Sequence, residues 1–236
     1  MSEATAAPDG LDDEAILLAG HGSRRAKSNE QVRELAADLE GRLGIPVDAA
    51  FLELAEPAID DAIAGLAATV SQVTVVHLSL FAASHVKNDV PLAVTQARER
   101  HPELTINNGA HLGVHPALLS LLDDRAAAVE AELGVDRAAD DVAVVVCARG
   151  SSDPDANADV HKLARLLYEG REFERCDASF IGVTAPLLAE TLHDVAKTRP
   201  DAVVVLPYML GDGVLTGRIK DGAREFDDEY PYVDAG

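Results

Sequence analysis

The chain has 236 residues, 47% of them hydrophobic, so it is long enough for one large or two small domains with a full core. Its net charge of −21, from 41 acidic and 20 basic residues, argues against nucleic acid or an anionic membrane as a partner. The sequence has no run of about 18 apolar residues, so it predicts no transmembrane helix. The acidic amino terminus lacks the apolar segment of a secretory signal.

The first predicted element is a short buried strand at 15–19, after residues 1–13, which we interpret as the disordered acidic lead-in of a cytoplasmic protein. The strand runs through GHGS at 20–23 into an amphipathic helix at 30–43. Because the strand ends at glycine and a helix follows, His21 is expected at the carboxyl edge of a sheet. Open α/β sheets bind their ligands at this edge. A glycine-rich turn with a merely exposed histidine is the alternative for this stretch alone.

Strands and helices then alternate along the chain. Such alternation, with helices of about 10–15 residues, predicts a doubly wound α/β fold, in which helices cover both faces of a parallel sheet. The next predicted strands are 47–54, 71–81 and 104–110, and the helices that follow them are 55–68, 91–100 and 115–134.

The pattern starts again after a polar, acidic linker at 136–141. The segment ARGSSDPDANADV at 148–160 lies over GHGSRRAKSNEQV at 20–32, and Gly, Ser, Asn and Val recur 128 residues later. In the second strand the spacing is 129, as two homologous halves with one insertion would show. We therefore predict a tandem repeat of two similar halves, 14–134 and 140–236, which form a monomeric fused pseudo-dimer.

The second half is predicted to lack its last helix, because nothing at the end of the chain repeats the helix at 115–134. A missing helix would expose one face of the second sheet. Either the chain is truncated or another element covers that face, and the sequence leaves both open.

A comparison of the two halves separates the positions that recur in both, which we call the frame, from the groups in the first half that could do chemistry. In the first half, His21, Glu53 and His85 follow three different strands at one predicted sheet edge. Two imidazoles with a nearby carboxylate can hold a borderline divalent metal, although each histidine alone could be an exposed structural residue. The second half keeps the frame without these groups. Their counterparts there, in the same order, are Arg149, Gly182 and Val214.

The other candidate groups are assigned structural roles. We expect His77, in mid-strand, to be a hydrogen-bonded core residue, and His115 to cap the helix that Pro116 begins, with metal ligation as the alternative. Cys147 and Cys176 are interpreted as buried thiols, and a disulfide stays open. The chain has no G-x-S-x-G elbow, no phosphate-binding P-loop and no G-x-G-x-x-G turn, which argues against a serine hydrolase or a nucleotide-binding protein.

Four motifs in combination resemble the sirohydrochlorin chelatases of the CbiX type. They are GHGSR at 20–24, FLELAEPAI at 51–59, LFAASHVKNDVP at 80–91 and LGVHP at 112–116. The resemblance covers nearly the whole chain, because two-half members of the family carry a second motif similar to ARGSSDPDAN. This chain departs from the family pattern at Ser84, where glycine is usual, and at His77, where proline is usual. Neither departure affects the histidine pair.

The resemblance implies an ATP-independent class II chelatase, a lyase that inserts cobalt or else iron into sirohydrochlorin in cobalamin or siroheme biosynthesis. It places the metal on His21 and His85 and the assisting acid on Glu53, with Glu56 as a rival. The metal, which could also be nickel, is then a substrate, and no cofactor is permanently bound. We expect the tetrapyrrole carboxylates to be bound by residues around the same edge: Ser23, Arg24, Arg25, Ser84, Lys87 and Arg149.

Two other functions are kept open. A metal or tetrapyrrole carrier would use the same pocket without chemistry, and a transferase that binds phosphate at the glycine turn has less support. For the chelatase we predict one active site per chain, with the second half as a wall of the cleft and Arg149 gripping a substrate carboxylate. The alternative for Arg149 is a surface pair with Asp153 or Asp155.

The acidic residues are spread along the chain rather than gathered in one block, which disfavours an acidic interaction tail. An acid-rich, lysine-poor surface is typical of proteins from salt-loving organisms, because molar salt screens the repulsion between carboxylates within about 3 Å. We therefore interpret the chain as a halophilic protein.

Overall fold

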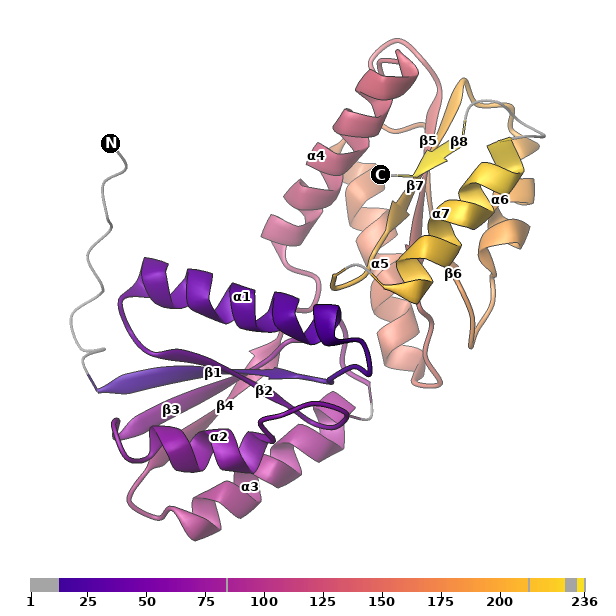
Figure 1. Cartoon of the computed structure of the whole chain (residues 1–236). Helices are drawn as coiled ribbons and strands as arrows, with labels where there is room; N and C mark the ends of the chain where they lie inside the picture. The colour runs from indigo at the N-terminus through magenta and orange to yellow at the C-terminus, as the bar shows by residue number, and fades with distance from the viewer. Residues whose placement is uncertain (1–12, 84, 212, 228–232, 236) are drawn as a thin grey trace, which may run out of the picture. The chain divides into compact units, whose positions relative to one another are not determined.

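The structure is a computed structural model, and it describes residues 13–83, 85–211, 213–227 and 233–235 (Figure 1). The predicted lead-in at 1–13 lies outside the described residues except for Asp13. The carbonyl oxygen of Asp13 accepts hydrogen bonds from the amides of Ser71 and Gln72, at 3.2 and 3.1 Å. The chain divides into two compact units, Met1–Leu112 and Gly113–Gly236.

Unit 1 is built on a four-stranded parallel sheet in the order β2-β1-β3-β4. Helix α1 packs on one face of this sheet, while α2 and α3 pack together on the other (Figure 1). The elements are β1 (Glu14–Gly20), α1 (Ala26–Leu43), β2 (Val47–Phe51), α2 (Ile59–Leu66), β3 (Gln72–His77), the π-helical turn η1 (His85–Asp89), α3 (Val90–Arg100) and β4 (Thr105–His111).

The central strand of unit 1 is buried on both faces. Leu17 faces α2 and α3 in one core cluster, and Leu18 faces α1 in another. A parallel strand covered on both sides needs a continuous apolar run, which explains why 15–19 is recognisable in the sequence. Strand β4 lies at the sheet edge, and of its seven residues only Ile106 is buried.

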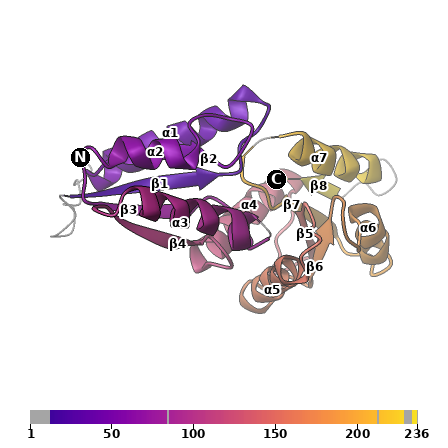
Figure 2. The same cartoon turned by 90° about the horizontal axis from the view of Figure 1, so that it is seen from below.

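Unit 2 repeats this architecture, with a four-stranded parallel sheet in the order β6-β5-β7-β8. Helices α6 and α7 pack together on one face, and α4 packs beside α5 on the other (Figure 2). The elements are α4 (Pro116–Leu133), β5 (Val142–Ala148), α5 (Pro154–Gly170), β6 (Arg175–Phe180), α6 (Leu188–Ala196), β7 (Ala202–Pro207), α7 (Val214–Asp227) and β8 (Val233–Ala235).

Helix α4 lies in a different unit from the one expected from the repeat. The sequence predicts it in the half 14–134, but it packs on β7, β8 and α5, and the boundary between units falls after Leu112. Helix α4 covers the face of the second sheet that was expected to be bare. Sequence similarity marks the repeated unit, but it does not show which sheet a connecting helix packs on.

Two predicted strands are shorter in the structure. The strand predicted at 47–54 ends at Phe51, and the one predicted at 71–81 ends at His77. Leu54 has a left-handed backbone with φ of 63°, which is incompatible with an extended strand. The apolar runs therefore continue beyond the strands into the loops at the carboxyl edge of the sheet.

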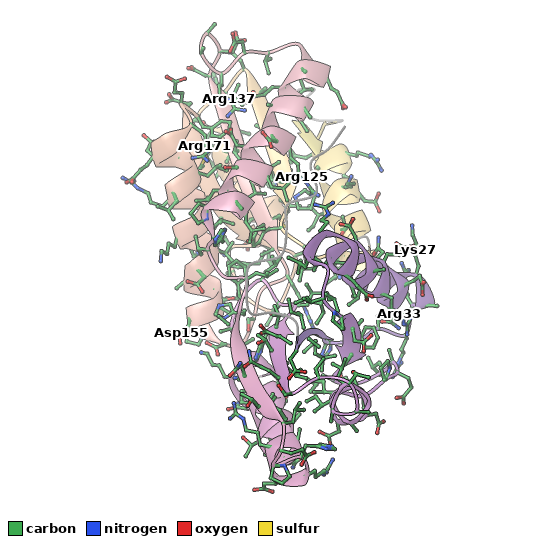
Figure 3. All side chains as sticks on the ribbon, turned by 90° about the vertical axis from the view of Figure 1, so that its left-hand side faces the viewer. Lys27, Arg33, Arg125, Arg137, Asp155 and Arg171 are labelled. Carbon is green, nitrogen blue, oxygen red and sulfur yellow. The ribbon has the colours of Figure 1, made fainter. Side chains whose placement is uncertain are left out.

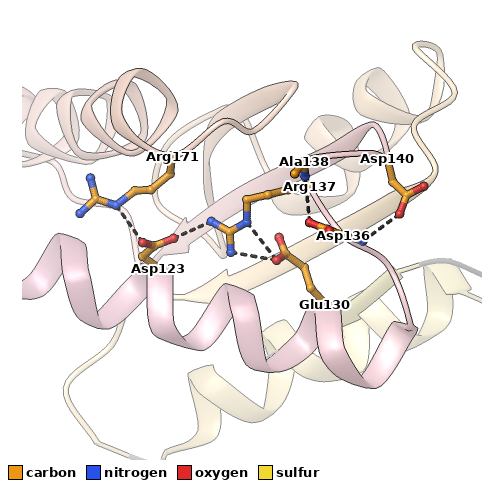
Figure 4. Close-up of polar contacts among 7 residues, drawn as sticks. All are labelled: Asp123, Glu130, Asp136, Arg137, Ala138, Asp140 and Arg171. Carbon is orange, nitrogen blue, oxygen red and sulfur yellow. Dashed lines mark hydrogen bonds and ion pairs between the residues drawn. The ribbon is translucent and has the colours of Figure 1, made fainter.

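A half-buried ion-pair network holds α4 in unit 2 (Figure 4). Arg137, whose side chain is 14% exposed, binds Asp123 at 2.5 Å and Glu130 at 2.9 Å, both of them on α4. Arg171, which follows α5, binds the second oxygen of Asp123 at 3.2 Å, and both arginines lie beside α4 (Figure 3). The Arg137 guanidinium also stacks on the ring of Phe173, with its carbon 4.0 Å from the ring centroid.

The two cysteines are free thiols. Burial raises the pKa of Cys147 to about 11, and burial together with the charge of Asp177 raises that of Cys176 to about 12. Both thiols are therefore protonated at neutral pH, which makes them poor nucleophiles and poor metal ligands. In the described part of the chain, no helix combines the length and the apolar character needed to cross a membrane.

We predict that Arg137→Met lowers the free energy of unfolding of unit 2 by about 3 kcal/mol, because it leaves the buried Glu130 carboxylate uncompensated. The matched control is Arg165→Met, whose pair with Glu169 is 66% and 53% exposed and should cost less than about 1 kcal/mol. Calorimetric melting of the full chain measures both. Equal shifts for the two variants would contradict the proposed role of the network.

Candidate functional site

The turn between β1 and α1 is fixed by one asparagine. The Asn29 side chain is buried, accepts a hydrogen bond from the Ser23 amide at 2.9 Å, and donates one to the Ser23 carbonyl oxygen at 2.7 Å. The Ser23 hydroxyl oxygen accepts from the Arg25 amide at 3.1 Å. These bonds hold residues 20–29 in one conformation, so His21 is presented at a defined place.

Gly22 allows this turn to touch the loop after β2. Its φ is +89°, and a Cβ placed there would lie 1.8 Å from the carbonyl oxygen of Glu53. The two loops are also joined by backbone hydrogen bonds, from Leu52 to Gly20 at 2.9 Å and from Glu53 to His21 at 3.1 Å. Only glycine satisfies both the conformation and the contact.

This contact brings His21 and Glu53 together as the sequence predicted. His21 Nε2 lies 3.3 Å from Glu53 Oε1, and the two side chains are 45% and 53% exposed. The pair is therefore preformed and open to solvent on one side. An imidazole nitrogen and a carboxylate oxygen at this spacing can bind one metal ion together, or pass a proton between them.

Glu56, the rival acid, has a structural role in the same loop. Its carboxylate accepts from the amide of Ala58, just before α2, at 3.2 Å, and its carbonyl oxygen accepts from Arg33 Nη2 at 2.8 Å. Arg33, on α1 (Figure 3), also stacks over the ring of Phe51 at 5.3 Å. Arg33 thus ties the loop that carries Glu53 to α1. Arg33 could not be recognised from the sequence, because nothing local indicates a contact with a loop 23 positions away.

The second predicted metal ligand follows the next strand. The strand order β2-β1-β3 places Glu53, His21 and His85 after three neighbouring strands, with His21 in the middle. His85 is the first residue of η1, a π-helical turn of the kind often found at functional sites. The side chain of His85 and the whole of Ser84 lie outside the described residues.

Cationic residues lie around this edge. Arg24, Arg25 and Lys87 are exposed, and the two arginines form no ion pair within the described part of the chain.

The two histidines that were expected to have structural roles do so. His77 is buried, and its Nε2 lies 2.7 Å from Asn108 Oδ1. His115 caps α4, and its side chain accepts a hydrogen bond from the amide of Ala117 at 3.1 Å.

Unit 2 repeats the frame of the site in atomic detail. Asn157 forms the same two bonds with the backbone of Ser151, at 2.9 and 2.8 Å. Gly150 has a φ of +83°, and a Cβ there would lie 2.1 Å from the carbonyl oxygen of Gly182. The ligands are missing, because Arg149 and Gly182 occupy the places of His21 and Glu53.

Arg149, on the turn after β5, is exposed. Asp153 caps α5 by accepting from the amide of Asp155 at 3.0 Å. Within the described residues, no cluster of three or more His, Cys, Asp or Glu side chains could hold a metal. His21 and Glu53 are therefore the described members of the predicted metal centre.

We predict that Gly22→Ala and Gly150→Ala each destabilise the unit that carries them by about 2 kcal/mol or more, since both force a side chain into the left-handed region and against a carbonyl oxygen. Only Gly22→Ala should also weaken metal binding, because it separates His21 from Glu53. Melting curves and a metal titration of the full chain measure the two effects. A loss of metal affinity in Gly150→Ala alone would contradict this assignment.

Comparison with known proteins agrees with these features. The family model described as CbiX matches residues 15–129 and again residues 143–235, so both halves of the repeat are recognised. The sirohydrochlorin cobaltochelatase of Priestia megaterium is 34% identical over 221 residues, which are 93% of this chain and 72% of that protein. The sirohydrochlorin ferrochelatase of the same organism is 32% identical over 213 residues, 88% of this chain and 77% of that protein.

A solved structure shows the same fold. The structure described as SirB from Bacillus subtilis with Fe3+ superimposes with a TM-score of 0.84 at 28% sequence identity, and the match covers 95% of this chain and 87% of that one. Two tandem parallel-sheet halves, a glycine turn that holds His21 against Glu53, and a family match over both halves lead to one conclusion. The chain is a two-half member of the CbiX family.

Proposed function

We propose that this chain is an ATP-independent chelatase that inserts a divalent metal ion into sirohydrochlorin. The observation that carries the proposal is the pair formed by His21 Nε2 and Glu53 Oε1, 3.3 Å apart, exposed and held by the Gly22 contact. The relatives named as cobaltochelatase and ferrochelatase support the substrate and the reaction class.

A chelatase must bind its metal and then release it to the ring. Neutral imidazole binds borderline divalent ions, and a carboxylate adds charge without the strong retention of a thiolate. His21 and Glu53 are about half exposed, so an ion bound by them keeps an open side for the pyrrole nitrogens. His85, which begins η1 after the neighbouring strand, supplies the second imidazole in this proposal.

Insertion exchanges two ring protons for one divalent ion, and no electron is transferred. Two pyrrole N–H bonds break and four metal–nitrogen bonds form, while the ion gives up its bonds to the protein ligands and to water. A base must therefore take up protons at the ring face. Glu53 is the base in our proposal, with His21 as the alternative once the ion has left it, since each can pass a proton to the other across 3.3 Å.

The substrate is a polycarboxylate, whereas the protein carries a net charge of −21. Local cations must therefore attract it. Arg24 and Arg25 on the turn after β1 and Lys87 in η1 are exposed near the metal pair, and Arg149 occupies the corresponding turn of unit 2. Arginine binds carboxylates through two parallel hydrogen bonds, which fixes orientation as well as charge. The Ser23 hydroxyl, and Ser84 after β3, complete the proposed set.

We propose cobalt as the metal inserted, with iron as the alternative. The support is that the cobaltochelatase of Priestia megaterium matches slightly more of the chain at higher identity than the ferrochelatase of the same organism, 93% at 34% against 88% at 32%. A competition assay with equal cobalt, iron and nickel, read by the absorbance of each product, should show cobalt insertion first. Preferred iron insertion would reverse this choice.

A carrier that binds metal or tetrapyrrole without chemistry would use the same residues. The two functions differ in turnover: catalytic amounts of a chelatase accelerate the absorbance change of sirohydrochlorin mixed with metal, whereas a carrier changes at most one equivalent. An insertion rate equal to that of a protein-free control would favour the carrier.

For the metal pair we predict that His21→Ala and His85→Ala each lower the insertion rate at least about 100-fold, and that Glu53→Gln lowers it about 100-fold or more, since a positioned base contributes about 10²- to 10⁴-fold. The matched control is Glu56→Gln, which removes charge from the same loop and should keep activity within about twofold. Circular dichroism checks that each variant folds. Wild-type activity in folded His21→Ala would refute the proposed site.

For the substrate we predict that Arg149→Ala raises the Michaelis constant for sirohydrochlorin about tenfold while the metal affinity stays unchanged, a pattern that reports lost substrate binding. Arg165→Ala, on α5 of unit 2, serves as the control for removing one exposed arginine charge. A Michaelis constant unchanged from the wild type would exclude Arg149 from the substrate site.

A further inference from the structure

One side chain of α1 reaches the loop that follows β2 and carries Glu53. Arg33, labelled on α1 in Figure 3, donates from Nη2 to the carbonyl oxygen of Glu56 at 2.8 Å, and its guanidinium carbon lies 5.3 Å from the centroid of the Phe51 ring. Phe51 ends β2, and its amide closes the loop by donating to the carbonyl oxygen of Pro57 at 2.9 Å. Arg33 therefore contacts both the beginning and the end of this loop.

The Arg33 guanidinium has two polar partners of different weight. Nη1 lies 3.2 Å from Glu30 Oε2 on the same helix, and because both side chains are exposed, this ion pair contributes little to stability. The bond from Nη2 to the loop has a charged donor and a length of 2.8 Å, which are the features of a strong hydrogen bond. The contact with the loop is therefore the one that we expect to have consequences.

The backbone of the loop is strained directly beside Glu53. The next residue, Leu54, has a left-handed backbone with φ of 63°, which a bulky side chain rarely adopts. Leu54 is 51% exposed, so core packing does not compensate for the cost. A strained conformation persists only where the surrounding contacts hold it. Each contact that fixes this loop thus narrows the range of positions open to the Glu53 carboxylate.

Unit 2 builds the same loop without the arginine. Phe180 ends β6, its amide donates to the carbonyl oxygen of Pro186 at 3.0 Å, and Val183 repeats the left-handed turn with φ of 68°. His161 stands where Arg33 stands in unit 1, 128 residues later. It keeps the contact with the phenylalanine, with its ring centroid 5.8 Å from that of Phe180. In the described part of unit 2, no hydrogen bond joins His161 to the loop, so the loop fold itself does not require the arginine.

We propose that Arg33 is a positioning residue of the metal centre, which acts through the Glu56 carbonyl to hold the Glu53 carboxylate beside His21. The hydrogen bond from α1 is present in the unit whose loop carries a carboxylate, and it is missing where Gly182 takes that place. This inference rests on the proposed function and adds a residue that touches neither the metal nor the tetrapyrrole. Groups that orient a metal ligand from behind typically change metal affinity about 10- to 100-fold when they are removed.

The first test is a cobalt titration of the full-length protein, read by the visible absorbance of the bound ion. Arg33→His introduces the residue that unit 2 has at this position, and it removes the guanidinium donor from the Glu56 carbonyl. We expect the cobalt dissociation constant to rise about tenfold. The control is Arg42→His, also on α1, whose exposed pair with Asp38 should leave the constant within about twofold. An unchanged constant in Arg33→His would overturn the proposal.

The second test asks whether Arg33 acts through Glu53. In a double-mutant cycle, Arg33→His should weaken cobalt binding about tenfold in the wild type but less than about twofold in Glu53→Gln, because the group that it positions is then no longer a charged ligand. His161→Arg in unit 2 should leave cobalt affinity unchanged, since Gly182 has no carboxylate to place. The same loss in both backgrounds of the cycle would mean that Arg33 acts by another route, and would overturn the proposal.

A third comparison separates positioning from folding. Arg33→Lys keeps a charged donor at the same place and should bind cobalt within about threefold of the wild type. A folded lysine variant that binds as weakly as Arg33→His would exclude the hydrogen bond as the cause. Circular dichroism and melting curves check every variant. If Arg33→His does not fold, the arginine is a requirement of the fold, and the proposal is wrong.

The outcomes distinguish this inference from the proposed function. If the wild type does not bind cobalt, or if Glu53→Gln binds it as well as the wild type does, the proposed metal pair fails and the inference fails with it. If Glu53→Gln weakens cobalt binding and Arg33→His does not, only the inference fails. A higher Michaelis constant for sirohydrochlorin in Arg33→His with unchanged cobalt affinity would make Arg33 a substrate contact, which also overturns the proposal.

Discussion

The close approach of two loops at the edge of each sheet is the constraint on which the rest of this molecule depends. At Gly22 and Gly150 the chain takes a left-handed turn directly against the carbonyl oxygen of the loop from the neighbouring strand, where no side chain fits. In unit 1 this contact sets His21 beside Glu53. In unit 2 the same contact holds Gly150 against the carbonyl oxygen of Gly182, and the neighbouring Arg149 is exposed. One steric requirement thus builds the same turn in both units.

The division of labour between the units follows from this shared frame. The first edge carries an imidazole and a carboxylate, which suit a hydrated cation that must be bound and then released. The second edge carries Arg149 and Gly182 at the positions of His21 and Glu53, so it lacks both groups. Because the chain as a whole is strongly acidic, long-range attraction favours the metal, and the tetrapyrrole must be recognised by local contacts.

The sequence was most informative where a structural feature leaves a local pattern of residues. The buried strands, the glycine turn, the repeat and the placement of His21 and Glu53 at one sheet edge could be predicted, because continuous apolar runs and fixed spacings are local signals. Strand ends were placed too late at 47–54 and 71–81, since apolar residues continue into exposed loops such as the one at Leu54. The packing of α4 in unit 2 and the anchoring contact of Arg33 could not be predicted, because both depend on tertiary contacts.

The central claim is that metal is held by the first unit alone. Anomalous diffraction from crystals of the full chain soaked in cobalt, recorded at the cobalt absorption edge, locates every bound ion directly. The account predicts one strong peak, within bonding distance of His21 and beside Glu53 and His85, and no peak at the edge that carries Arg149. A peak of equal height at the second edge, or a single peak away from His21, would contradict it.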